Sequence, residues 1–148
     1  MLARQSGSVD LALSPMSIGR TTVLIADDDP LIRETFRYPL EQKGYRVLMA
    51  DDGVSAMDVI GSSNVNIVLL DILMPNKEGL ETLLEIKRRF PGVVVHVMSG
   101  GGSRNKTDFL TIAAKFGADG VIRKPFTSRD LLRLIESGGN ARATVSGA

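Results

Sequence analysis

Acidic residues stand at two places in the sequence where an apolar run ends. Asp27, Asp28 and Asp29 follow one run directly, and Asp71 follows another. Carboxylates that a fold brings within a few ångströms repel one another, and a divalent cation relieves that repulsion. Because neither His nor Cys accompanies these acids, oxygen atoms alone would ligate the ion, which favours a hard cation such as Mg2+. The acidic residues therefore predict a magnesium site.

A hydroxyl and an ammonium group follow two later apolar runs, at Ser99 and Lys124. A carboxylate beside Mg2+ can attack a phosphoryl group in line, while the metal and a lysine neutralise charge on the transferred oxygens. Asp71 is the predicted attacking group. The product would carry roughly one additional negative charge or more, together with new acceptor oxygens. These oxygens would reorganise nearby donors such as Ser99 and Lys124.

Five apolar runs must position these side chains, and each precedes a segment with apolar residues at helical spacing. Several runs lack polar alternation, which is typical of parallel strands covered by helices on both faces. We therefore expect an α/β fold with a doubly wound, five-stranded parallel sheet. Ligands bind such sheets at the carboxyl ends of the strands, where the acids, the hydroxyl and the lysine would meet. The expected strands are 22–26, 45–50, 66–70, 93–98 and 120–122.

Composition limits the possible classes of function. The 148 residues, 43% hydrophobic and 24% charged, are typical of one globular domain, and the net charge of +1 does not favour a nucleic-acid partner. The one basic run, 87–89, is interpreted as a solvated helix end. The absence of cysteine excludes disulfides and thiolate metal sites.

No apolar run reaches the ~20 residues that span a bilayer. We therefore expect no membrane partner and a cytoplasmic location. Residues 1–20 and 137–148 are rich in small and polar residues and are expected to be flexible tails around a domain at 21–136.

Three motifs resemble the receiver domain of two-component response regulators: ADDDP at 26–30, LLDILMP at 69–75 and KPF at 124–126. They occur in order, at the ends of expected strands, and the resemblance covers about residues 21–136. It implies a flavodoxin-like (βα)5 fold with strand order 2-1-3-4-5.

The resemblance also implies a role for each motif residue. Asp71 is the implied phosphoacceptor. Asp27, Asp28 and Asp71 are the implied Mg2+ ligands, together with the backbone carbonyl of Leu73. Lys124 is implied to pair with the phosphoryl group.

Two further positions are assigned by the same resemblance. Ser99 is similar to the family's switch hydroxyl, and the bond between Lys124 and Pro125 is implied to be cis. Val121 occupies the position where most receivers carry Tyr or Phe, so the usual aromatic switch residue is missing. About three more residues than usual separate Ser99 from Lys124, including glycines at 100–102, which favour a flexible switch loop over a nucleotide-binding loop.

The leading hypothesis is a stand-alone receiver, similar to the chemotaxis response regulator. Its expected phosphate donor is a sensor histidine kinase or a histidine phosphotransfer protein. It would signal to an unknown protein target as a monomer or weak homodimer, without an output domain and without turning over external substrates. A constitutive binding module is a second hypothesis. A phosphatase of the haloacid dehalogenase type is a third, although such enzymes carry a second Asp where this chain has Leu73.

Three residues near these motifs have structural interpretations. Asp29, before Pro30, is interpreted as a helix N-cap rather than a third metal ligand from this run. His96 is interpreted as a buried, hydrogen-bonded histidine rather than a phosphotransfer or metal residue. Gly79 is expected to permit a turn or a close approach.

Overall fold

The computed structural model describes residues 20–72, 79–99 and 106–137, and for 106–110 it describes the backbone only. Strands and helices alternate along these residues. The strands are β1 Thr22–Ala26, β2 Arg46–Ala50, β3 Ile67–Asp71, β4 Val94–Ser99 and β5 Gly120–Arg123. The helices are α2 Pro30–Gln42, α3 Gly53–Ser62, α4 Gly79–Arg89, α5 Lys106–Lys115 and α6 Ser128–Glu136.

The five strands form one parallel sheet in the order β2-β1-β3-β4-β5. This confirms the predicted α/β class, the doubly wound topology and the strand order. Because all strands run in the same direction, their carboxyl ends lie along a single edge. The strand order reverses beside β1, so β1 and β3 form the centre of that edge.

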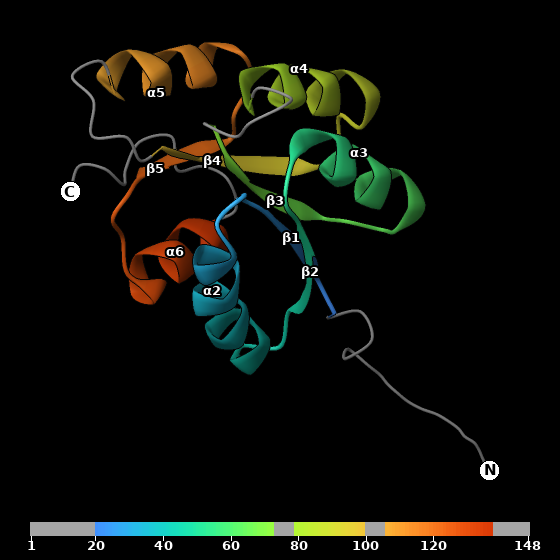
Figure 1. Cartoon of the computed structure of the whole chain (residues 1–148), viewed down its shortest axis with the longest axis vertical. Helices are drawn as coiled ribbons and strands as arrows, with labels where there is room; N and C mark the ends of the chain where they lie inside the picture. Colours follow the sequence, from blue (N-terminus) through green and yellow to red (C-terminus); the bar gives the residue numbers. More distant parts are fainter. Residues whose placement is uncertain (1–19, 73–78, 100–105, 138–148) are drawn as a thin grey trace.

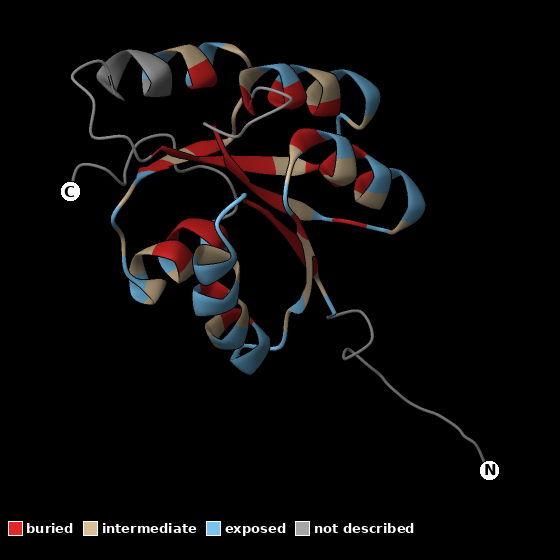
Figure 2. Cartoon of the chain, in the orientation of Figure 1, coloured by how far each residue is buried: buried red, intermediate tan, exposed pale blue. Residues whose placement is uncertain are grey.

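The helices cover both faces of the sheet. Figure 1 shows α3, α4 and α5 on one face and α2 and α6 on the other. Each face has its own core cluster, one containing Leu24, Val68 and Val95, the other Ile25 and Leu69. Figure 2 shows β1, β3 and β4 as mostly buried strands between the helices. Burial on both faces explains why the strand sequences lack polar alternation.

The first described helix, α2, begins where the sequence predicted. The side chain of Asp29 accepts a hydrogen bond from the backbone N–H of Leu31, and Pro30 occupies the first helical position. This satisfies one of the backbone donors that a helix start leaves unpaired. The N-cap interpretation of Asp29 is confirmed. The cap fixes the start of α2 directly after Asp27 and Asp28, which follow β1.

Gly79 permits a close approach, as expected. A Cβ atom at this position would collide with the backbone of Ile72, the residue that follows Asp71. The start of α4 therefore packs directly on the end of β3. Ile72 is further held by its N–H, which donates to the carbonyl of Met98 at 2.9 Å.

The structure also bears on the expectations about the basic run and about membrane-spanning segments. The basic run 87–89 forms the last turn of α4, as predicted, although Lys87 is half-buried and pairs with Asp119 at 2.9 Å. Within the described ranges, none of the helices combines the length and apolar character needed to cross a bilayer. The tails 1–20 and 137–148 lie almost wholly outside the described residues, so the proposed domain limits stay a prediction.

Candidate functional site

Three carboxylates meet at the carboxyl edge of the sheet. Asp27 follows β1, Asp28 comes next, and Asp71 ends β3. One carboxylate oxygen from each lies within 4.8 Å of the others. Asp27 is fully buried and Asp71 is 4% exposed, whereas Asp28 is exposed. The group therefore has two buried members and one at the rim.

Lys124 places an ammonium group against the two buried carboxylates. Its Nζ lies 2.9 Å from Oδ2 of Asp27 and 3.6 Å from Oδ2 of Asp71. Burial alone would lower the pKa of Lys124, but the hydrogen bond to Asp27 and the charges of Asp71 and Asp27 outweigh it and raise the pKa. The ammonium thus stays charged and offsets part of the acidic charge.

Backbone contacts fix the end of β5 that carries Lys124. Its N–H donates to the carbonyl of Ser99 at 2.8 Å, and the bond between Lys124 and Pro125 is cis. Phe126 then stacks on Phe36 of α2, with ring centroids 4.8 Å apart. The KPF motif is therefore anchored both to β4 and to the helix that follows Asp27.

Ser99 ends β4 at the same edge. It is 1% exposed, and its Oγ has no hydrogen-bond partner among the described residues. Buried hydroxyls normally have a partner, so an orphaned one calls for an explanation. A group with acceptor oxygens entering beside Asp71 and Lys124 would supply the missing partner.

Asp27 has further contacts through its other oxygens. Oδ1 accepts from the N–H of Asp29 at 2.9 Å, and the backbone carbonyl accepts from Nη1 of Arg33 at 2.7 Å. Arg33 was not among the residues predicted to form the site. The available signal was its place in the first turn of α2, one turn beyond the N-cap Asp29.

The residues present fit Mg2+. The group offers only carboxylate oxygens, and one of them, Asp28, is open to solvent, so water and phosphate oxygens could complete the shell that this ion prefers. Leu73, the implied backbone ligand, lies outside the described residues, as do the glycines at 100–102.

Val121 and His96 lie elsewhere on the sheet. Val121 is half-buried, pairs in register with Val97 and packs against the core cluster beneath α3, α4 and α5. His96 is buried as expected, but the expected hydrogen bond is wrong: neither ring nitrogen has a partner among the described residues. The ring packs against Gly120, where an added Cβ atom would lie 2.5 Å from its Nδ1. Burial lowers the pKa of His96 to about 4, so the ring is neutral at pH 7.

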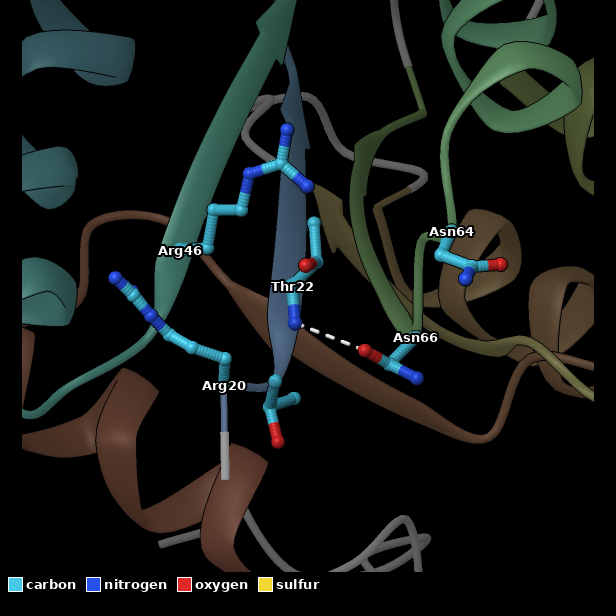
Figure 3. A pocket seen from close by; sticks show the side chains of 6 residues that line it. Arg20, Thr22, Arg46, Asn64 and Asn66 are labelled. Atoms are coloured by element: carbon cyan, nitrogen blue, oxygen red, sulfur yellow. Dashed lines mark hydrogen bonds between the residues drawn. The ribbon is translucent and has the colours of Figure 1, made fainter. Parts of the chain in front are cut away.

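A polar pocket of about 500 Å3 lies at the opposite edge, where β1, β2 and β3 begin (Figure 3). Thr22 donates its N–H to Oδ1 of Asn66 there, at 2.8 Å. None of its described lining residues carries a carboxylate, and it lies at the other end of the strands from the acidic group. Its lining residues are Arg20, Thr21, Thr22, Arg46, Asn64 and Asn66.

Comparison with known proteins agrees with the motifs. The family model described as "Response regulator receiver domain" matches residues 23–136. The chain is 31% identical to a receiver domain protein (CheY-like) from Methanospirillum hungatei JF-1, with a TM-score of 0.73, and the match covers 84% of this chain and 97% of that one.

Two other solved structures are similar over the same part of the chain. A receiver domain protein from Clostridium thermocellum is 29% identical, with a TM-score of 0.73 and coverage of 82% and 95%. NtrX from Brucella abortus is 30% identical, with a TM-score of 0.75, and the match covers 83% of this chain but 27% of NtrX. The same fold thus occurs both as most of a solved chain and as one part of a longer one.

Proposed function

We propose that this chain, which belongs to the response regulator receiver domain family, accepts a phosphoryl group on Asp71 and thereby switches its contacts with a partner protein. Receiver domains are signalling modules of two-component systems. The observation that carries the proposal is the grouping of Asp27, Asp28 and Asp71 with the Lys124 ammonium, beside a buried Ser99 hydroxyl that has no partner among the described residues.

In the proposed transfer, a carboxylate oxygen of Asp71 forms a bond to phosphorus. The bond from phosphorus to a histidine nitrogen of the donor breaks, and that ring keeps the electron pair and takes a proton from solvent. The donor is a sensor histidine kinase or a histidine phosphotransfer protein. Asp27, Asp28, Asp71 and the carbonyl of Leu73 would hold Mg2+, which when bound neutralises charge on the phosphoryl oxygens.

Lys124 and Ser99 respond to the new acceptor oxygens. Lys124 already lies between Asp27 and Asp71, so a small displacement of its ammonium reaches a group on Asp71. The Ser99 hydroxyl donates to a phosphoryl oxygen and loses its unsatisfied state. Because Ser99 and Lys124 are joined through their backbones, the ends of β4 and β5 move together.

The output differs from that of receivers with an aromatic switch residue. Val121 has less surface to move between pockets than Tyr or Phe. We therefore propose that the change is read by a partner protein from the ends of β4 and β5 rather than from a rotating ring. The protein acts in the cytoplasm as a monomer or weak homodimer, binds no nucleic acid and turns over no external substrate.

The test is intact-protein mass spectrometry after incubation with acetyl phosphate, with and without Mg2+. We expect the mass of one phosphoryl group to be gained, and the gain to require both Mg2+ and Asp71. Asp71→Asn removes the nucleophilic carboxylate with little change in shape, and Asp58→Asn, on the exposed face of α3, is the matched control. An unmodified but folded wild-type chain would instead support the constitutive binding module. Multiple turnover of simple phosphoesters would support the phosphatase.

A further inference from the structure

Arg33 contacts the backbone that carries the acidic residues. Its Nη1 donates to the carbonyl of Asp27 at 2.7 Å, and its side chain is half-buried in the first turn of α2. Its own N–H donates to the carbonyl of Asp29 at 3.2 Å, so the helix backbone holds the arginine in place. The guanidinium thus joins α2 to the peptide that links Asp27 to Asp28.

Asp28 depends on its backbone for its direction. Its carboxylate is exposed and makes no hydrogen bond to another described residue. Asp27 differs, because Lys124 and the N–H of Asp29 each hold one of its carboxylate oxygens. Whatever fixes the peptide between Asp27 and Asp28 therefore limits where the Asp28 carboxylate can point.

We propose that Arg33 is a positioning residue of the magnesium site: it fixes the Asp27–Asp28 peptide so that the exposed Asp28 carboxylate stays directed toward the ion. The inference rests on the proposed function, because it concerns the same metal site. Partners outside the ligand shell that orient ligands commonly change metal affinity by about tenfold or more.

The sign of the effect separates positioning from simple charge. A positive guanidinium near the site repels a divalent cation, so loss of its charge alone would tighten Mg2+ binding. Loss of a positioning contact weakens Mg2+ binding. A purely structural role would lower the stability of the metal-free protein without a selective change in Mg2+ affinity.

The experiment measures Mg2+ affinity of the whole chain by titration of backbone amide signals in NMR. We expect Arg33→Met to bind Mg2+ about tenfold more weakly than wild type. Arg33→Lys, which keeps a donor and a charge, should recover part of the loss. The control is Arg37→Met, with the same charge change on the same helix, where the arginine pairs with Glu34 and Glu41. We expect the control to stay within about twofold of wild type.

Thermal unfolding without Mg2+ shows whether each variant is folded at the titration temperature. If Arg33→Met is not folded, Arg33→Gln replaces it in the Mg2+ titration. Mg2+ binding by Arg33→Met equal to or tighter than that of Arg37→Met, in a wild type that binds Mg2+, would overturn the inference and leave the proposed function standing. A wild type that binds no Mg2+ would overturn both.

Discussion

At the scale of single residues, Lys124 and the proposed Mg2+ would compete for the same oxygens. The ammonium lies 2.9 Å from a carboxylate oxygen of Asp27, one of the proposed metal ligands. It therefore stabilises the buried acids in the absence of a divalent ion, and a bound Mg2+ would have to displace it or tolerate its charge. The same lysine would then be available to a phosphoryl group on Asp71.

Lys124→Met should have opposite effects on metal binding and on phosphorylation. We expect Mg2+ to bind roughly tenfold more tightly, because a competing cation is removed. Phosphorylation by acetyl phosphate should be slower, because the transferred oxygens lose a positive neighbour. Mg2+ titration followed by NMR and the rate of mass gain measure the two effects. The control is Lys43→Met, which removes an exposed lysine beside Glu136 and should change neither Mg2+ affinity nor the rate of phosphorylation. Weaker Mg2+ binding by Lys124→Met would refute the competition.

Ser99→Ala tests whether the orphaned hydroxyl costs stability. Its Oγ is buried and has no partner in the part of the chain that the structure describes, so removing it should leave the free energy of unfolding unchanged or raise it by about 1 kcal/mol. Ser55→Ala removes a hydroxyl that takes part in the capping box of α3, and should lose about 1 kcal/mol. Denaturant unfolding without Mg2+ compares them. A clear loss in Ser99→Ala would mean that the hydroxyl already has a partner.

At the scale of elements, the position of Asp71 depends on how α4 meets β3. Gly79 leaves no space for a Cβ atom against Ile72, which directly follows Asp71. The acidic group is thus held by strand ends that are themselves held by helix starts. Because Ile72 directly follows Asp71, a change in the packing of α4 against Ile72 should displace Asp71.

Gly79→Ala should cost roughly 1–3 kcal/mol, because its methyl group overlaps backbone that cannot move freely. Gly61→Ala is the control, since a Cβ there meets nothing within 4 Å and alanine favours a helix by about 1 kcal/mol. Denaturant unfolding should therefore give changes of opposite sign. Equal stability of the two variants would show that α4 can move away from β3 at little cost.

The sequence was informative about these elements because burial on both faces leaves strands as uniform apolar runs. It also predicted the cap at Asp29, since Asp before Pro has a specific local role. Contacts between distant elements were harder to predict. The bond from Arg33 to the Asp27 carbonyl depends on where α2 meets β1. The surroundings of His96, whose ring nitrogens have no partner among the described residues and whose ring packs against Gly120 of β5, likewise depend on how distant strands pair.

At the scale of the whole molecule, His96 makes stability depend on pH. It lies in β4 between two neighbouring strands, fully buried, with its pKa lowered from 6.5 to about 4, chiefly by burial. The unfolded chain therefore binds a proton near pH 6.5, whereas the folded chain resists it until about pH 4. The contribution of His96 to stability is therefore complete above pH 6.5 and is lost as the pH drops through this window.

We expect this histidine to account for a loss of roughly 3 kcal/mol between pH 6.5 and pH 4, at 1.4 kcal/mol per pKa unit. The measurement is the free energy of unfolding against pH for wild type and His96→Leu. Carboxylates titrate in the same range in both proteins, so the difference between the two curves isolates the histidine. Parallel curves would mean that His96 is protonated in the folded state as easily as in the unfolded one.

The central claim is that Asp71 carries the phosphoryl group, and borohydride trapping tests it most directly. Borohydride reduces an acyl phosphate to an alcohol, which converts a phosphorylated aspartate to homoserine. The protein is treated with acetyl phosphate and Mg2+, reduced and digested, and the peptides are sequenced by tandem mass spectrometry. We predict homoserine at position 71, only when both reagents are present. Homoserine at Asp27 or Asp28, or none in a folded protein that binds Mg2+, would contradict the claim.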